Sequence, residues 1–150
     1  MDQKRDRSEA RAMALQTLYH IEINPDEVEV ITRRLDTESF SLSRPLPQDA
    51  YQYFLNLVRG IKEQQEKIDK VIQRFLKGWS FARLAIVDRS ILRLAVYELL
   101  YLPQIPKGVV INEAIELAKT FSTEKSGKFV NGVLGSVANH LDELRSGGAK

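Results

Sequence analysis

The sequence contains no cysteine, only two histidines and no apolar run that approaches the length of a membrane span. Without cysteine the chain forms no disulfide and no thiolate, which is typical of a reducing compartment, so we expect a cytoplasmic protein. A transmembrane helix needs roughly 18 apolar residues in succession, and no such stretch occurs. The polar start, MDQKRDRSEA, does not resemble a secretory signal. We therefore expect no contact with a membrane.

Residues typical of catalysis are also scarce. His20 and His140 are the only histidines, and neither has a carboxylate at the spacing of a metal site or a proton relay. The sequence has no P-loop, GxGxxG, GxSxG or HExxH motif. It therefore predicts a protein that is not an enzyme, with no catalytic residue, no metal and no cofactor, and with both histidines on the surface.

The chain does contain a substantial apolar fraction and an uneven distribution of charge. Its hydrophobic content of 43% over 150 residues is enough for one folded domain. We place this domain at residues 1–145 and expect the end, SGGAK (146–150), to be a disordered tail. Residues 21–58 carry three basic and seven acidic groups, whereas residues 59–150 carry fifteen basic and ten acidic groups. A basic face could attract a polyanion, but a mixed solvated surface is the simpler explanation.

Apolar residues recur at helical spacing along most of the chain, and no alternation of the strand type persists. The inner face of the first helix is expected to consist of Ala10, Met13, Ala14, Thr17, Leu18 and Ile21. Gly60 is expected to separate two helices, Gly78 to cap the second of them, and Thr37–Pro47 to form a loop. The predicted helices span residues 5–23, 25–35 (with Val28, Ile31 and Leu35), 48–59, 61–77 and 83–102, and a final pair lies within 110–135.

The central helix, Arg83–Leu102, is apolar on almost all sides, which predicts that it is mostly buried. For Arg89 and Arg93 on its polar side, pairing with Glu113 or Glu116 on a neighbouring helix is favoured over anion binding.

Trp79 and Asp88 lie before and within this helix. Trp79 is predicted to plug the core, because large aromatic side chains are usually mostly buried. Asp88 points with the apolar side chains, where an unpaired carboxylate is costly. It therefore either caps the start of the helix or lies where the helix contacts another molecule, and capping is the favoured interpretation.

The first helix begins with a basic stripe. Lys4, Arg7 and Arg11 project in the same direction as the apolar residues that follow them. These cations could frame the entrance of a groove. Equally, they could cover the edge of the core or pair with nearby acids at positions 2, 6 and 9.

The segment Val110–Gly135 has the pattern of two amphipathic helices joined by a short polar turn, where Lys119, Lys125 and Lys128 gather. Ser126 is expected to cap the second helix and Lys128 to lie in its first turn. A helix start with cations and aromatic residues could hold a phosphate backbone and stack a base, although an ordinary helical hairpin explains the pattern as well. The small residues Gly132 and Gly135 are expected to permit close helix packing.

Three long blocks in this part of the chain resemble the NusB family of bacterial transcription antitermination factors: WSFARLAIVDRSILRLAVYELL, PKGVVINEAIELAKTF and SGKFVNGVLG. The N-terminal pattern from Arg7 to Tyr19 is similar too, and the resemblance covers about residues 5–141. It implies an all-α fold of about seven helices in two packed helical sub-bundles and a role without catalysis.

The resemblance also implies partners and sites. Members of this family bind boxA RNA of nascent ribosomal transcripts together with ribosomal protein NusE, and they join other Nus factors on RNA polymerase. A helical protein–protein interaction module without RNA binding is the alternative, and a homodimer of the free protein is left open. The implied RNA-binding residues are Lys4, Arg5, Arg7, Arg11, Lys119, Ser126 and Lys128, with Lys125 beside them, and the implied NusE-facing residues are Tyr19 and Asp88. Because the resemblance assigns the turn to RNA binding, Phe121 and Phe129 are interpreted as core anchors that fix the position of the turn.

Overall fold

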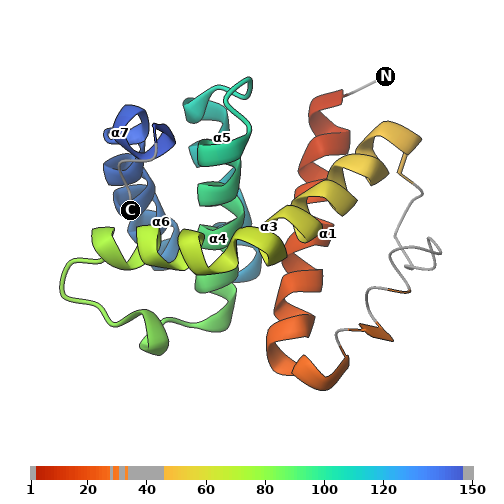
Figure 1. Cartoon of the computed structure of the whole chain (residues 1–150), viewed down its shortest axis with the longest axis horizontal. Coiled ribbons are helices and arrows are strands. Elements are labelled where there is room, and N and C mark those ends of the chain that lie inside the picture. The colour runs from red at the N-terminus through yellow and green to blue at the C-terminus, as the bar shows by residue number, and fades with distance from the viewer. Residues whose placement is uncertain (1–2, 28, 31–32, 34–45, 147–150) are drawn as a thin grey trace. The chain divides into compact units, whose positions relative to one another are not determined.

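The computed structural model describes residues 3–27, 29–30, 33 and 46–146, and these ranges contain helices, turns and no strand. The predicted all-α fold is confirmed (Figure 1). None of the described helices combines the length and the apolar character that crossing a membrane requires. In chain order the elements are α1 (Gln3–Ile23), the 3₁₀ helix η1 (Pro25–Glu27), α3 (Gln48–Phe75), the 3₁₀ helix η2 (Phe81–Arg83), α4 (Ile86–Tyr101), α5 (Lys107–Phe121), α6 (Glu124–Ala138) and α7 (Leu141–Arg145).

Several predictions fall outside the described residues and are not tested by them. These are the apolar positions Val28, Ile31 and Leu35 of the predicted second helix, the loop up to residue 45, and the tail from residue 147.

The chain divides into two compact units, Met1–Arg59 and Gly60–Lys150, and α3 passes from one to the other. In the first unit, all six residues predicted for the inner face of α1 are buried. Thr17 is accommodated there because its hydroxyl donates to the carbonyl of Met13 at 2.9 Å. The first half of α3 contributes further buried side chains, which include Tyr51, Phe54 and Leu57.

Helix α3 runs without interruption through Gly60, so the predicted break at this residue is wrong. A Cβ atom at position 60 would collide with the phenol ring of Tyr97. The glycine is therefore explained by the close approach of α4 and not by a helix end. Gly78 does have a positive φ of 75°, but α3 ends at Phe75, so Gly78 lies beyond the cap that was predicted for it.

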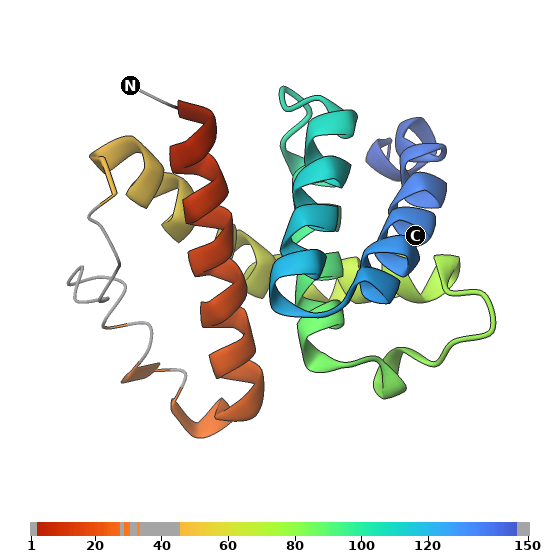
Figure 2. The same cartoon turned by 180° about the vertical axis from the view of Figure 1, so that it is seen from behind.

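In the second unit α4 is the central element, as predicted. Ten of its sixteen residues are buried, and α5, α6 and α7 all contact it. Helices α5 and α6 lie side by side (Figure 2). Apolar residues from the second half of α3, such as Ile61, Ile68 and Ile72, are fully buried in the same unit.

Arg93 of α4 has a partner that the sequence did not indicate. Arg93 is buried and donates from Nε and Nη2 to the two carboxylate oxygens of Asp69 on α3, at 2.8 and 3.1 Å. The guanidinium carbons of Arg89 and Arg93 lie 5.7 and 5.4 Å from the ring centroid of Phe81. This partner of Arg93 is an acid 24 positions earlier in the chain, and helical periodicity alone could not reveal it.

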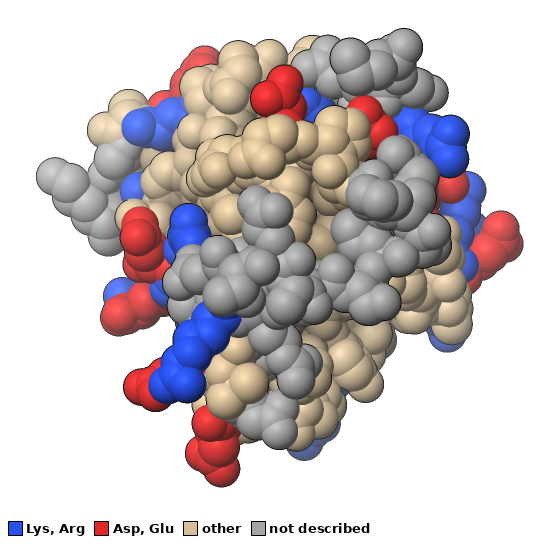
Figure 3. All heavy atoms as spheres, turned by 90° about the vertical axis from the view of Figure 1, so that its right-hand side faces the viewer, with Lys and Arg blue, Asp and Glu red and all other residues tan. Residues whose placement is uncertain are grey.

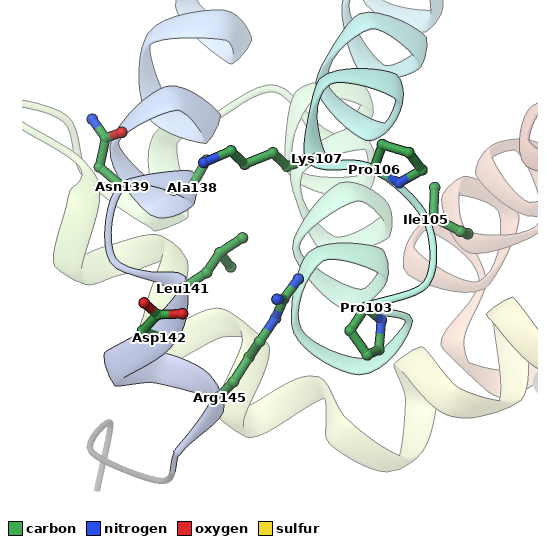
Figure 4. A pocket seen from close by; sticks show the side chains of 9 residues that line it. All are labelled: Pro103, Ile105, Pro106, Lys107, Ala138, Asn139, Leu141, Asp142 and Arg145. Atoms are coloured by element: carbon green, nitrogen blue, oxygen red, sulfur yellow. The ribbon is translucent and has the colours of Figure 1, made fainter.

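The short helix α7 folds back against the end of α4. Arg145 donates from Nε and Nη2 to the carbonyl of Leu99 at 3.0 and 2.8 Å. A cavity of about 400 Å³ lies beside this contact, at the end of α5 opposite the turn that joins it to α6 (Figure 4). Its lining consists of Pro103, Ile105, Pro106, Lys107, Ala138, Asn139, Leu141, Asp142 and Arg145.

Two smaller predictions about the second unit also need correction. A Cβ atom at Gly132 or Gly135 would meet no other atom within 4 Å, so these glycines do not serve close helix packing. His140 is half-buried and not a plain surface residue, because its ring lies 5.0 Å from that of Phe75. His20 in the first unit is half-buried as well.

Candidate nucleic-acid interface

The basic start of α1 has an exposed part and an anchored part. Lys4 and Arg5 are exposed, and Arg5 forms a weak ion pair with Glu9 at 3.7 Å, one helical turn away. Arg5 does not belong to the predicted stripe of Lys4, Arg7 and Arg11, so this ion pair does not decide between the two explanations weighed for that stripe.

Tyr53 on α3 anchors the remaining two arginines. The guanidinium carbons of Arg7 and Arg11 lie 5.0 and 5.6 Å from its ring centroid, within the range of a cation–π contact. Arg11 also donates to the Tyr53 hydroxyl at 3.3 Å, and only 3% of Arg11 is exposed. Arg11 would have to leave Tyr53 to reach an RNA, whereas half-buried Arg7 keeps part of its surface open.

A cavity of about 490 Å³ opens between the start of α1 and the start of α3. Its charges are mixed, so a groove entrance framed by cations alone is not what the structure shows. Figure 3, which views this side of the molecule, shows acidic and basic side chains interspersed among the described residues. The lining residues are Asp6, Arg7, Pro47, Asp49, Ala50, Gln52, Tyr53 and Asn56.

The turn between α5 and α6 consists of Ser122 and Thr123, and it confirms the predicted helical hairpin. The cap, however, is Thr123 and not Ser126: the Thr123 Oγ1 atom accepts from the Ser126 backbone N–H at 3.0 Å. Because α6 therefore begins earlier than predicted, its first turn contains Glu124, which favours the helix dipole. Lys128 lies beyond this first turn, so the position predicted for it is wrong.

Ser126 instead lies at the centre of a small hydroxyl network. Its Oγ donates to Asp88 Oδ2 on α4 at 3.2 Å and accepts from Thr123 Oγ1 at 3.1 Å. Since a hydroxyl has one proton, the 2.9 Å contact between Ser126 and Ser122 requires Ser122 to donate. All three hydrogen bonds of the Ser126 hydroxyl are thus made inside the protein, so this residue fixes the turn to α4.

Asp88 does not cap α4, because the helix begins at Ile86 with Ala85 as its cap residue. Its Oδ1 atom is buried without a hydrogen-bond partner among the described residues, and its Oδ2 atom holds Ser126. Of the two interpretations weighed for Asp88, capping is therefore wrong. The other residue predicted to face a protein partner, Tyr19, is 41% exposed on α1.

The cations of the hairpin turn are accessible. Lys119 is exposed, and the only ion pair that the structure describes for it is a long one, 4.0 Å to Glu116. Lys125 and Lys128 are exposed on α6, and neither forms an ion pair or hydrogen bond with any residue in the described ranges. These two amines are therefore available to an anion without breaking a contact.

The aromatic residues near this turn differ from expectation. Phe121 is 37% exposed and Phe129 is half-buried, so neither is the core anchor that was inferred. Trp79, predicted to plug the core, is 60% exposed, and its ring lies 5.5 Å from that of Phe129. The sequence did not indicate this pairing, because the two residues are 50 positions apart and aromatic burial is only a statistical tendency.

Known proteins resemble this chain over most of its length. The model of the NusB family matches residues 8–139. The transcription antitermination protein NusB of Carboxydothermus hydrogenoformans is 41% identical over 139 residues, which cover 93% of this chain and 96% of that protein.

Two solved structures extend the likeness to three dimensions. A structure of T. maritima NusB is 40% identical, covers 89% of this chain and 90% of its own, and has a TM-score of 0.77. A crystal structure of the antitermination factors NusB and NusE in complex with dsRNA contains a chain that is 32% identical, with coverages of 93% and 98% and a TM-score of 0.74. Sequence and fold agree along nearly the whole chain, which therefore belongs to the NusB family.

Proposed function

We propose that this protein is an RNA-binding transcription antitermination factor that binds boxA RNA of nascent ribosomal transcripts together with ribosomal protein NusE. The observation that carries the proposal is the match over 93% of the chain to a structure that contains NusB, NusE and RNA. The curated relative with 41% identity is likewise a transcription antitermination protein. The role requires binding and no chemical step, and it belongs in the bacterial cytoplasm, where transcripts are made.

The hairpin turn is the stronger of the two proposed RNA-binding surfaces. Lys125 and Lys128 are exposed without a partner in the described part of the chain. Phosphates can therefore bind these amines without breaking an existing contact. Lys119 adds a third cation whose one described ion pair is weak. Ser126 contributes by holding the turn in place through Asp88.

The start of α1 is the second proposed surface. Lys4 and Arg5 are exposed, and Arg7 is held by the ring of Tyr53, which limits the freedom that it would lose on binding. Arg11 donates to the hydroxyl of Tyr53 and so helps to hold the ring that Arg7 contacts. Acidic residues among these cations make us expect modest intrinsic affinity, with NusE supplying further contacts.

For NusE we propose contacts through Tyr19 and Asp88. Tyr19 offers an exposed aromatic ring with a polar tip, a side chain type enriched in protein interfaces. Asp88 is half-buried, and its buried Oδ1 atom has no described partner, so NusE would have to reach the exposed part of this side chain. Binding to other Nus factors and to RNA polymerase, and self-association into a homodimer, are further proposals that follow from the same family role.

A gel-shift titration of a boxA oligonucleotide with the full-length protein, in the presence and absence of purified NusE, tests the proposal. We expect a weak shift by the protein alone and a much tighter one when NusE is added. The matched control is an oligonucleotide of equal length and scrambled sequence. If no shift occurs at low salt in either condition, the protein is an interaction module that does not bind RNA, and the proposal fails.

A further inference from the structure

The exposed indole of Trp79 is not used by any residue assignment above. It lies in the connection between α3 and α4 and contacts the first half of α6 through Phe129. Its ring is 60% exposed and packs against Phe129 of α6, with 5.5 Å between ring centroids and 59° between planes. Single exposed apolar residues are common, but a tryptophan that is both exposed and supported by a second aromatic ring presents a fixed apolar surface.

Two cations flank this aromatic pair. Lys125 precedes Phe129 by one helical turn, so both side chains lie on the same face of α6. Lys128 is the neighbour of Phe129 in sequence, and both amines are exposed without a partner in the described ranges. The next residue, Val130, is fully buried, which fixes this part of α6 in the unit.

We propose that Trp79, supported by Phe129, stacks on one base of single-stranded RNA while Lys125 and Lys128 hold the adjacent phosphates. Single-stranded RNA alternates phosphates, which amines can bind, with planar bases, which can stack on an indole ring because every base has an apolar face. A surface on which amines border an indole therefore matches this ligand. A protein partner could also cover an indole, but the unpaired amines beside this one favour a polyanion. The inference rests on the proposed function, because the ligand is the same RNA.

Trp79 is the only tryptophan in the chain, so its fluorescence reports on this site alone. Titration of the full-length protein with a boxA oligonucleotide is expected to quench the emission in parallel with the gel shift. Inorganic polyphosphate, a polyanion without bases, is the matched control and is expected to leave the emission unchanged. A gel shift without any change in Trp79 emission would overturn the proposal. So would quenching by NusE alone to which RNA adds nothing, because Trp79 would then be a protein contact.

Variants separate this inference from the proposed function. Stacking on one base contributes about 1–3 kcal/mol, so Trp79→Ala is expected to weaken RNA binding about 5- to 150-fold, and Trp79→Phe should restore most of it. Phe121→Ala, which removes another exposed aromatic ring at the same hairpin, is the matched control. If Lys125→Gln and Lys128→Gln weaken binding while Trp79→Ala does not, the stacking role is wrong and RNA binding stands. If no RNA binds to the unmodified protein, the proposed function itself fails.

Discussion

The buried ion pair between Arg93 and Asp69 is the single contact whose loss we expect to cost the most stability. The two side chains are only 7% and 18% exposed. Asp69→Ala removes a carboxylate and two hydrogen bonds from the buried guanidinium, which should lower the free energy of unfolding in urea denaturation by about 3–5 kcal/mol. The matched control is Glu66→Gln, which removes an exposed ion pair with Lys70. It should change the free energy of unfolding by less than about 1 kcal/mol. Equal effects of the two variants would contradict this account.

Tyr97 should make the protein sensitive to alkaline conditions. Burial, followed by the charges of Glu63 and Tyr101, raises the pKa of its phenol above the ordinary value of 10.0. The folded state therefore favours the neutral phenol, and this contribution is complete below pH 10 and is lost as the pH rises through the folded-state pKa. We expect Tyr97→Phe to lose less unfolding free energy than the unmodified protein between about pH 9 and about pH 11. The same alkaline loss in both proteins would show that Tyr97 is not responsible.

For single residues, the sequence predicted which positions of α1 are buried better than it predicted which side chains contact one another. The inner face of α1 follows from helical spacing alone, and all six predicted residues are buried. The contact of Arg11 with Tyr53 joins residues 42 positions apart, so no local pattern contains it. The exposure of Trp79 contradicts a composition-based tendency, because burial depends on which elements happen to cover a position.

Among the helices, Gly60 shows how tertiary packing can override a local signal. Gly60→Ala places a Cβ atom against the Tyr97 ring, and we expect a net loss of about 1–3 kcal/mol in unfolding free energy. The matched control is Gly132→Ala on α6, where nothing lies within 4 Å, and where better helix propensity should stabilise by about 0.5–1 kcal/mol. If Gly60→Ala stabilised the protein as Gly132→Ala does, the close approach of α4 would not explain the glycine.

The link between α6 and α4 through Ser126 and Asp88 predicts coupled mutations. Ser126→Ala and Asp88→Ala each remove the hydrogen bond of 3.2 Å, so their effects on unfolding should be non-additive by about 1 kcal/mol. Thermal or urea denaturation of both single variants and the double variant measures this coupling. Ser136→Ala, which removes an exposed hydroxyl bonded to the Gly132 carbonyl on the same helix, should cost less than about 0.5 kcal/mol. Strictly additive effects would argue against the link.

Most of the described helices could be predicted because they have an apolar face, whereas the continuity of α3 through Gly60, the short helix α7 and several helix ends could not. Thr123 and Ser126 are both plausible caps three positions apart, and only the backbone geometry selects Thr123. A glycine at position 60 is a reasonable helix end on propensity, and only the neighbouring ring shows why it occurs within one. The cations of the turn were predicted as a group because they are close in sequence.

For the whole molecule, the central claim is that a protein of low net charge binds RNA through a few well-placed cations. The formal net charge is only +2, and acidic and basic side chains are interspersed on the face in Figure 3. Long-range attraction alone is therefore a weak explanation of RNA affinity. Local phosphate contacts at the hairpin turn must therefore supply most of the electrostatic part of the RNA-binding free energy. The number of these contacts can be measured from the salt dependence of binding.

The most direct test is the salt dependence of boxA RNA binding in the presence of NusE, compared between the unmodified protein and a Lys125→Gln/Lys128→Gln double variant. Each phosphate contact with single-stranded nucleic acid contributes about 0.7 to the slope of log affinity against log salt. We predict that the double variant binds every RNA more weakly and that its slope is shallower by about 1.4. Lys107→Gln, at the opposite end of α5, should keep the slope of the unmodified protein. An unchanged slope in the double variant would contradict the assignment of the hairpin turn to RNA.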